Sequence, residues 1–268
     1  MEGKAAINTV QTPEAGIGKR MRKFFISVSD LSAFTLRFVK EAFTPKYEIY
    51  EFIKQAYLVG YQSFPLVAIT GFIMGLVLTI QSRPTLAQFG AESWLPAMVA
   101  VSIVREIGPV ITALIFAGKV GSGIGAELAS MKVTEQIDAM EVSGANPFKY
   151  LVVTRTLATT LMLPVLVVAS DGISLFGAYV GCNLKGDVSF KLFFLQVFDK
   201  LTFSDVFPAT IKTFFFGLAV GLIACYKGYN SNKGTAGVGE SANASVVYGS
   251  LCIFIIDMIA VQFTSLFN

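Results

Sequence analysis

The chain has 268 residues, of which 54% are hydrophobic and only 15% are charged, and its mean hydropathy is +0.64. Soluble domains carry about 25% charged residues, so the composition excludes an ordinary water-soluble domain and indicates an integral membrane protein. The absence of histidine excludes histidine-based acid–base chemistry and most transition-metal sites. The three cysteines lack metal-ligand spacing, and the net charge of +3 is too small to indicate nucleic-acid binding. We therefore expect no metal, no cofactor and no nucleic-acid partner.

The first predicted elements are polar and then amphipathic. Residues 1–23 form a polar N-terminal segment, which we expect in the cytoplasm. The following segment places Phe24, Val28 and Leu31 at helical spacing with charged residues elsewhere, which is typical of a helix lying in the membrane interface. We expect interfacial helices over about 24–62, and a single transmembrane domain over 24–268.

Five apolar runs follow, each long enough to cross a bilayer, which takes about 20 helical residues. They predict spans at about 64–82, 94–118, 150–182, 206–226 and 245–267. The predicted fold class is an all-α integral membrane protein with an N-terminal interfacial amphipathic helix and about five transmembrane helices. If the N-terminus is cytoplasmic, the inner segments hold fifteen Lys and Arg residues and the outer ones hold four. The positive-inside rule favours that orientation, with the C-terminus outside.

A short acidic segment, EQIDAMEVSGANP at residues 135–147, joins the second and third spans on the cytoplasmic side. On a helical wheel Ile137 and Met140 share one side, whereas Glu135, Asp138 and Glu141 occupy much of the other. Periodicity leaves two interpretations open. The helix either rests on its own protein with a solvated acidic face, or presents its carboxylates to a basic groove on a cytoplasmic partner.

The ends of this acidic helix carry stop signals. Thr134 is a suitable N-cap, because its hydroxyl can accept from a free N–H of the first turn. Gly144 suits the C-terminal cap, and Asn146-Pro147 prevents the helix from continuing.

Ionisable residues within the predicted spans are candidate functional residues, because a charge at the bilayer centre costs at least about 2.5–3.5 kcal/mol. They are Arg105, Glu106, Asp171, Lys212 and Asp257. They indicate either a polar cavity for a headgroup or an internal ion-pair network, with Arg105 paired to Asp257 and Glu106 to Lys212. Asp171 is expected at a helix contact or a watery crevice. Pro109 removes the helical donor for the Arg105 carbonyl, which predicts a bend there.

The glycine-rich run GKVGSGIG, residues 118–125, does not match a phosphate-binding loop, because its lysine precedes the glycines at the end of an apolar helix. Gly121 and Gly125 are better explained by close packing of helices. The chain therefore shows no segment for ATP hydrolysis, and any such energy must come from another subunit.

The order of residues across REIGPVITALIFAGKVGSGIGAELASMKVTEQIDAMEVSGANPFKYLVVTR, residues 105–155, resembles the signature region of the MlaE (YrbE) family of ABC-transporter permeases. Weaker similarity extends from Gly71 to the final span. The resemblance implies a non-catalytic permease subunit that moves phospholipids or related lipids between the inner membrane and an MCE-domain lipid-binding partner. It implies a homodimer in the bacterial inner (cytoplasmic) membrane, driven by a separate ATPase dimer that binds the acidic helix as a cytoplasmic coupling helix.

The resemblance also implies roles for particular residues. The residues expected to couple to the ATPase are Thr134, Glu135, Ile137, Asp138, Met140 and Glu141. Those expected to contact lipid are Leu78, Leu86, Phe89, Arg105 and Glu106. The intramembrane polar network would comprise Arg105, Glu106, Lys212 and Asp257.

The chain departs from the family pattern at a few positions. Lys119 stands for a usual Arg and Thr154 for a usual Pro. In the expected cytoplasmic loop GVGESANA, residues 237–244, Glu240 and Ala244 stand where Arg is usual. Contacts that those arginines make elsewhere are not expected in this chain.

Two other classes of function are compatible with these residues. An ion-coupled secondary transporter could use Arg105, Glu106 and Asp257 as a relay, although such folds tend to show internal repeats and this sequence has none. An intramembrane enzyme would be restricted to carboxylate chemistry.

Overall fold

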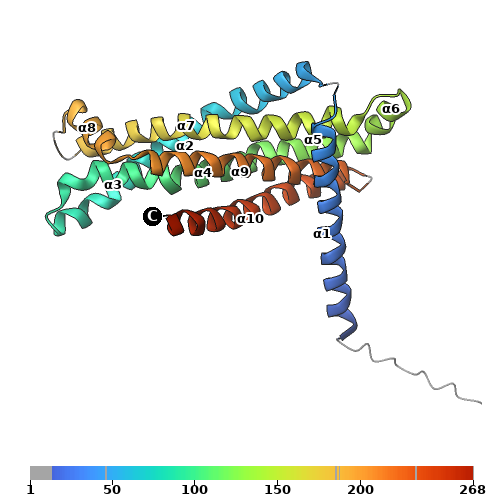
Figure 1. The fold of residues 1–268 in the computed structure, drawn as a ribbon, viewed down its shortest axis with the longest axis horizontal. Helices are drawn as coiled ribbons and strands as arrows, with labels where there is room; N and C mark the ends of the chain where they lie inside the picture. Colours follow the sequence, from blue (N-terminus) through green and yellow to red (C-terminus); the bar gives the residue numbers. More distant parts are fainter. Residues whose placement is uncertain (1–13, 46, 185, 187, 233, 268) are drawn as a thin grey trace, which may run out of the picture. The chain divides into compact units, whose positions relative to one another are not determined.

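The computed structural model describes residues 14–45, 47–184, 186, 188–232 and 234–267. Throughout these residues the regular structure is helical, with no strand (Figure 1). The α-helices are α1 (Glu14–Ala42), α2 (Ile49–Gln88), α3 (Leu95–Ser102), α4 (Gly108–Phe116), α5 (Ser122–Val133), α6 (Gln136–Val142), α7 (Thr154–Asn183), α8 (Phe190–Lys200), α9 (Phe203–Tyr229) and α10 (Thr235–Phe267). A 3₁₀ turn, η1 (Glu92–Trp94), precedes α3, and three π-helical turns, η2 (Ile103–Ile107), η3 (Ala117–Gly121) and η4 (Phe148–Val153), interrupt or begin longer helices.

The chain divides between Thr44 and Pro45 into two compact units. The first unit contains α1, which begins at Glu14, so the predicted boundary at residue 23 falls inside a helix. The physical reason is that Glu, Ala, Lys, Arg and Met are good helix formers, and a change to polar composition does not end a helix. Residues 1–13 of the predicted polar segment lie outside the described residues.

Five helical segments are long and apolar enough to cross a membrane. They are Ile49–Gln88, Glu92–Val133, Phe148–Asn183, Phe203–Tyr229 and Thr235–Leu266. Each contains one predicted span or nearly all of it, which confirms the all-α multi-pass fold. Each also extends beyond its apolar run, because polar residues at the membrane surface continue the same helix.

The region before the first span differs from the prediction. Residues 49–62 do not form a separate interfacial helix but are the first turns of α2, which runs unbroken for 40 residues. Pro65 and Pro84 lie inside α2 without ending it, as membrane helices can tolerate. The helix ends at Gln88, and Gly90, two residues further on, has a φ of 67°; its N–H and that of Ala91 bond back to the Ala87 and Leu86 carbonyls.

Three segments that lie outside the predicted spans are helical. The second span continues through α5 to Val133, and residues 237–244 form turns of α10. α8 is an additional amphipathic helix between the third and fourth spans, buried through Phe193 and Val197. Short polar stretches inside long helices do not stop them, and α8 is too short to register as a span.

Within the second unit, α2 and α7 lie side by side along their lengths (Figure 1). Their backbones touch at glycines from both helices. A methyl group placed on Gly75 would lie 1.8 Å from the Ser174 carbonyl oxygen, and one on Gly177 would lie 2.3 Å from that of Phe72. Small residues allow this approach, as in other membrane helix pairs. α7 also packs on α9, and α9 on α10 and α5.

Candidate functional site: the loop helix and two polar clusters

α6 projects at one end of the helical bundle, opposite the end that carries α3 and α8 (Figure 1). It is separated from α5 by a sharp turn at Glu135, whose φ of 58° is in the left-handed region that non-glycine residues seldom adopt. The predicted N-cap at Thr134 is wrong. Its hydroxyl donates to the Ser130 carbonyl at 2.9 Å, and the residue caps the C-terminus of α5 instead.

The C-terminus of α6 ends as predicted. Gly144 has a φ of 77°, its N–H donates to the Glu141 carbonyl at 3.0 Å, and the Ala145 N–H donates to the Met140 carbonyl at 3.1 Å. This pair of bonds is a Schellman motif, which satisfies carbonyls that the helix end would otherwise leave free. α6 is therefore a short helix whose C-terminal end is fixed by backbone hydrogen bonds.

One face of α6 is buried against its own protein, and the other face is exposed. Ile137 is only 1% exposed, and α6 contacts α5, so this side chain is buried in its own protein rather than offered to a partner. Asp138 accepts from Lys132 at 2.7 Å. Glu141 is exposed and Val142 is 90% exposed, so the surface open to a partner runs along these residues and Glu135.

A cluster of three charges, which we call the Lys212 cluster, lies inside the bundle, where α9, η2 and α10 meet. The Lys212 ammonium, 5% exposed, donates to Glu106 Oε2 at 2.6 Å and to Asp257 Oδ1 at 2.9 Å. The predicted pair Glu106–Lys212 is confirmed. The predicted pair Arg105–Asp257 is wrong, because Asp257 is bound to Lys212.

Arg105 points to a different partner. Its Nη1 lies 3.8 Å from Asp205 Oδ1, at the N-terminal end of α9. Both residues line a small recess together with Glu106 and Lys212, and the wall also includes Ser204 and Thr264. The sequence predicts a bend here from Pro109; the structure has a π turn, η2, in which the Gly108 N–H bonds to the Ile103 carbonyl five residues back.

The predicted lipid-contacting residues do not gather at one place. Leu78 and Leu86 of α2 pack against an apolar cluster of α3, α7 and α8 that includes Val99 and Phe193. Phe89 caps the end of α2 and is largely exposed. Among the described residues, these three are absent from the wall of the recess that Arg105 and Glu106 line.

Other predicted positions are helix contacts. A methyl group on Gly108 would lie 1.9 Å from Asp171 Oδ1, so Asp171 packs against the backbone of the second span. One on Gly125 would lie 2.3 Å from Ser245 Oγ of α10. The interpretation of Gly125 as a residue of close helix packing is confirmed.

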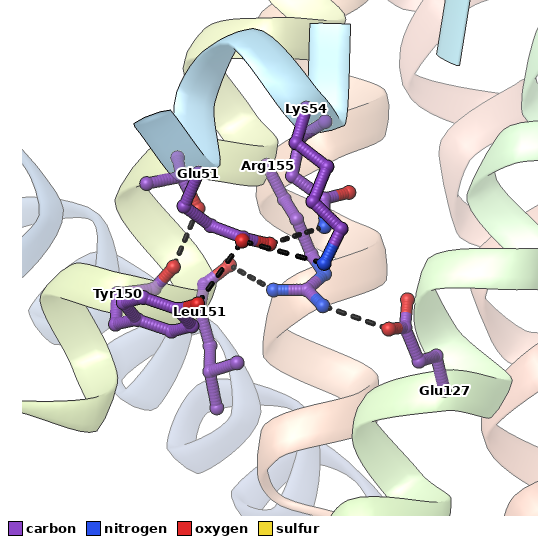
Figure 2. A network of polar contacts seen from close by, with 8 residues as sticks. Glu51, Lys54, Glu127, Tyr150, Leu151 and Arg155 are labelled. Carbon is purple, nitrogen blue, oxygen red and sulfur yellow. Dashed lines mark hydrogen bonds and ion pairs between the residues drawn. The ribbon is translucent and has the colours of Figure 1, made fainter. Parts of the chain in front are cut away.

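A second polar cluster ties together α2, α5 and η4–α7 near the α6 end (Figure 2). Arg155, whose side chain is 3% exposed, donates through Nη2 to Glu127 at 2.8 Å and through Nη1 to the Leu151 carbonyl at 3.1 Å. The buried Glu51 accepts from the Tyr150 hydroxyl at 3.0 Å and from the Gln55 amide at 2.7 Å. We call these residues the Arg155 cluster.

The sequence prediction missed the Arg155 cluster. Charged and aromatic residues near the ends of spans resemble ordinary interfacial residues, so Glu51, Tyr150 and Arg155 gave no distinct pattern. One usable signal was present: Glu127 and Arg155 each lie within a long helical pattern, on either side of the acidic segment, with opposite charges.

The fold and these sites define a multi-pass α-helical membrane protein with a fixed loop helix at one end and an ion-pair cluster inside. Residues 52–263 match the family model described as "Permease MlaE". A probable ABC transporter permease protein of Rickettsia felis is 38% identical over 239 residues, covering 89% of this chain and 92% of that protein. The intermembrane phospholipid transport system permease protein MlaE of Haemophilus influenzae is 34% identical over 209 residues, covering 77% and 80%. A probable ABC transporter permease protein of Pyropia yezoensis is 37% identical over 215 residues, covering 79% and 80%.

The chain therefore belongs to the MlaE permease family, as the motif between residues 105 and 155 indicated.

Proposed function

We propose that this chain is the permease subunit of an ABC transporter that moves phospholipids or related lipids between the bacterial inner membrane and an MCE-domain partner. A separate ATPase dimer binds at α6, and two copies of the chain form a homodimer. The N-terminus lies in the cytoplasm. The names of the Rickettsia and Haemophilus relatives support this assignment, as does the family match.

The observation that carries the proposal is the construction of α6. The helix is fixed by the buried Ile137, by its C-terminal cap and by the Lys132–Asp138 pair. It nevertheless presents exposed acidic and apolar side chains, Glu141 and Val142, at the end of the bundle. A helix that is rigidly attached and still exposed can transmit a displacement from a bound protein to the bundle. A loosely attached helix would move by itself and transmit little.

A route from α6 into the membrane follows from the packing. α6 continues from α5, and α5 packs against α9 and α10, which carry Lys212 and Asp257. We propose that ATP-driven displacement of α6 moves these helices and reshapes the recess beside Arg105. Arg105 and Glu106 then serve a polar headgroup, while Leu78 and Leu86 stabilise the α3–α8 end.

The test is charge reversal on α6. Changing Glu135, Asp138 and Glu141 to Lys together should lower lipid-dependent ATPase stimulation in the reconstituted complex about tenfold or more, equivalent to losing charge pairs at a protein interface. The control reverses two acids at the opposite end of the bundle, Glu92 and Asp199, and should leave stimulation unchanged. Monodispersity and melting temperature establish that both variants fold.

Full stimulation in the α6 variant would contradict the docking assignment. Lipid or ion movement by the purified chain under an ion gradient, with no ATPase present, would instead support the ion-coupled alternative.

A further inference from the structure

A polar crevice lies between the first half of α2 and the segment η3–α5, away from the recess at Arg105. Its polar wall comprises Gln55, Gln62 and Ser63 on one side and Lys119 and Glu127 on the other, with Gly123 opening between them. Its cavity volume is about 210 Å³. Both walls belong to helices long and apolar enough to span the membrane. None of these residues has a role in the proposed function.

Ser63 is the first indication that the crevice receives a ligand. The residue is 2% exposed, and its hydroxyl has no hydrogen-bond partner among the described residues. A buried hydroxyl left without a partner costs about 1–3 kcal/mol. A polar group entering the crevice would recover that cost.

The crevice also holds both signs of charge. Lys119 is exposed, and its ammonium reaches across to the backbone carbonyl of Gln62. Glu127 accepts from Arg155, yet its side chain is 52% exposed. The Arg155 cluster fixes the inner wall, because Gln55 is bound to Glu51 and Glu127 to Arg155. A ligand that carries one phosphate and one ammonium would meet an opposite charge at each end.

The surroundings favour a lipid over a soluble ion. The crevice also contains apolar side chains, Val59 and Ile124, below its polar groups. On α2 the large apolar residues Tyr61, Phe64 and Leu66 are exposed beside it. In a membrane span, such a surface faces acyl chains.

We infer that this crevice binds the headgroup of a zwitterionic glycerophospholipid, in which the phosphate accepts from Lys119 and Ser63 and the ammonium donates to Glu127. The inference deepens the proposed function and rests on it, since it gives a phospholipid permease a second lipid position near its α6 end. Charge-assisted hydrogen bonds of this kind are stronger than neutral ones.

The experiment uses the purified full-length chain without ATP or partner proteins, so its result does not depend on transport. The probe is a photoactivatable phosphatidylethanolamine, and crosslinked peptides are located by mass spectrometry. Wild-type protein should be labelled in the peptides carrying residues 55–63 and 119–127. Unlabelled phosphatidylethanolamine should compete at these peptides about tenfold more effectively than phosphatidylglycerol.

Two glycines provide matched variants. A Cβ atom placed on Gly123 or on Gly118 meets no atom within 4 Å, so both positions are open at the backbone, but only Gly123 lines the crevice. Gly123→Leu should lower labelling of these peptides about tenfold, and Gly118→Leu should leave it unchanged. Glu127→Gln, which keeps an oxygen for Arg155, should remove the preference for phosphatidylethanolamine.

Equal labelling of the Gly123→Leu variant and wild type would overturn the inference, as would no labelling of either peptide. Equal competition by the two lipids would show ordinary boundary lipid, and competition by soluble phosphoethanolamine would show a soluble ligand instead. If the α6 variants abolish no ATPase stimulation but this labelling pattern holds, the proposed coupling fails and the lipid position stands.

Discussion

The two polar clusters use different chemistry at different depths. The Lys212 cluster, in the middle of the spans, consists of charges alone: one cation held between two carboxylates. In the Arg155 cluster, near the α6 end, neutral groups also stabilise the charges. Tyr150 and Gln55 donate to Glu51, and the Leu151 carbonyl accepts from Arg155. Deep in the membrane only an opposite charge offsets the cost of losing water, whereas near the surface hydrogen bonds and partial hydration are sufficient.

The largest loss of stability is expected for Lys212→Met. The substitution removes the cation while Glu106 and Asp257 remain, and removing one partner of a buried ion pair costs about 3–5 kcal/mol. We expect the free energy of unfolding in mild detergent to fall by that amount. The control Lys200→Met removes a half-exposed lysine from a surface pair and should cost less than about 1 kcal/mol.

A rescue variant separates charge from packing. Adding Glu106→Gln and Asp257→Asn to Lys212→Met should recover most of the stability, since neutral replacement of a buried ion pair is often tolerated. Persistent destabilisation would mean that the lysine side chain holds the helices by its packing.

The next effect is expected at Arg155. Arg155→Met removes charge-assisted hydrogen bonds to Glu127 and to the Leu151 carbonyl, which are worth about 1.5–3 kcal/mol. The loss should be smaller than for Lys212, because the half-exposed Glu127 regains water. The comparison variant is Lys54→Met, which removes a 57%-exposed lysine whose ammonium lies 3.7 Å from the Glu51 carboxylate and should cost less than about 1 kcal/mol. A larger loss than in Lys212→Met would reverse the proposed order of the clusters.

The smallest effect is expected for Tyr150→Phe, which removes one hydroxyl that donates to Glu51 at 3.0 Å. One such bond is worth about 1 kcal/mol. Tyr57→Phe, at an exposed tyrosine on α2, is the matched control and should leave the unfolding midpoint in place. Indistinguishable midpoints for the two variants would show that Gln55 and Lys54 alone satisfy Glu51.

The sequence was sufficient to predict the helical spans, the end of α6 at Gly144 and the ion pair between Glu106 and Lys212. The length of the apolar runs predicts the spans, and the ability of glycine to adopt a left-handed backbone predicts the end of α6. The cost of an unpaired charge in the membrane predicts the ion pair. The partner of Arg105 could not be predicted, because neighbouring residues on a helix point about 100° apart and the π turn shifts their direction. Packing between helices decides such a rotation, and periodicity carries no information about it.

The position of Ile137 shows a second limit. The wheel identified its apolar side correctly, but the same pattern fits a side chain buried in its own protein and one offered to a partner. The left-handed turn at Glu135 sets the direction of α6 and so turns the side of Ile137 inward. The sequence does not predict that a residue other than glycine adopts this conformation. The Arg155 cluster was missed for a related reason: Glu51 and Tyr150 are 99 residues apart, and the packing of α2 on η4 that brings them together leaves no periodic pattern in the sequence.

The glycine contacts between α2 and α7 have a mechanical consequence. With Gly75 and Gly177 pressed against the opposite backbone, neither helix can turn about its own axis without steric collision. The two helices therefore resist rotation against each other and behave as one rigid pair, which carries Glu51 and Arg155 at its α6 end. Under the proposed coupling, a displacement of that end would tilt the pair as a whole, and the far end near α3 and α8 would move furthest.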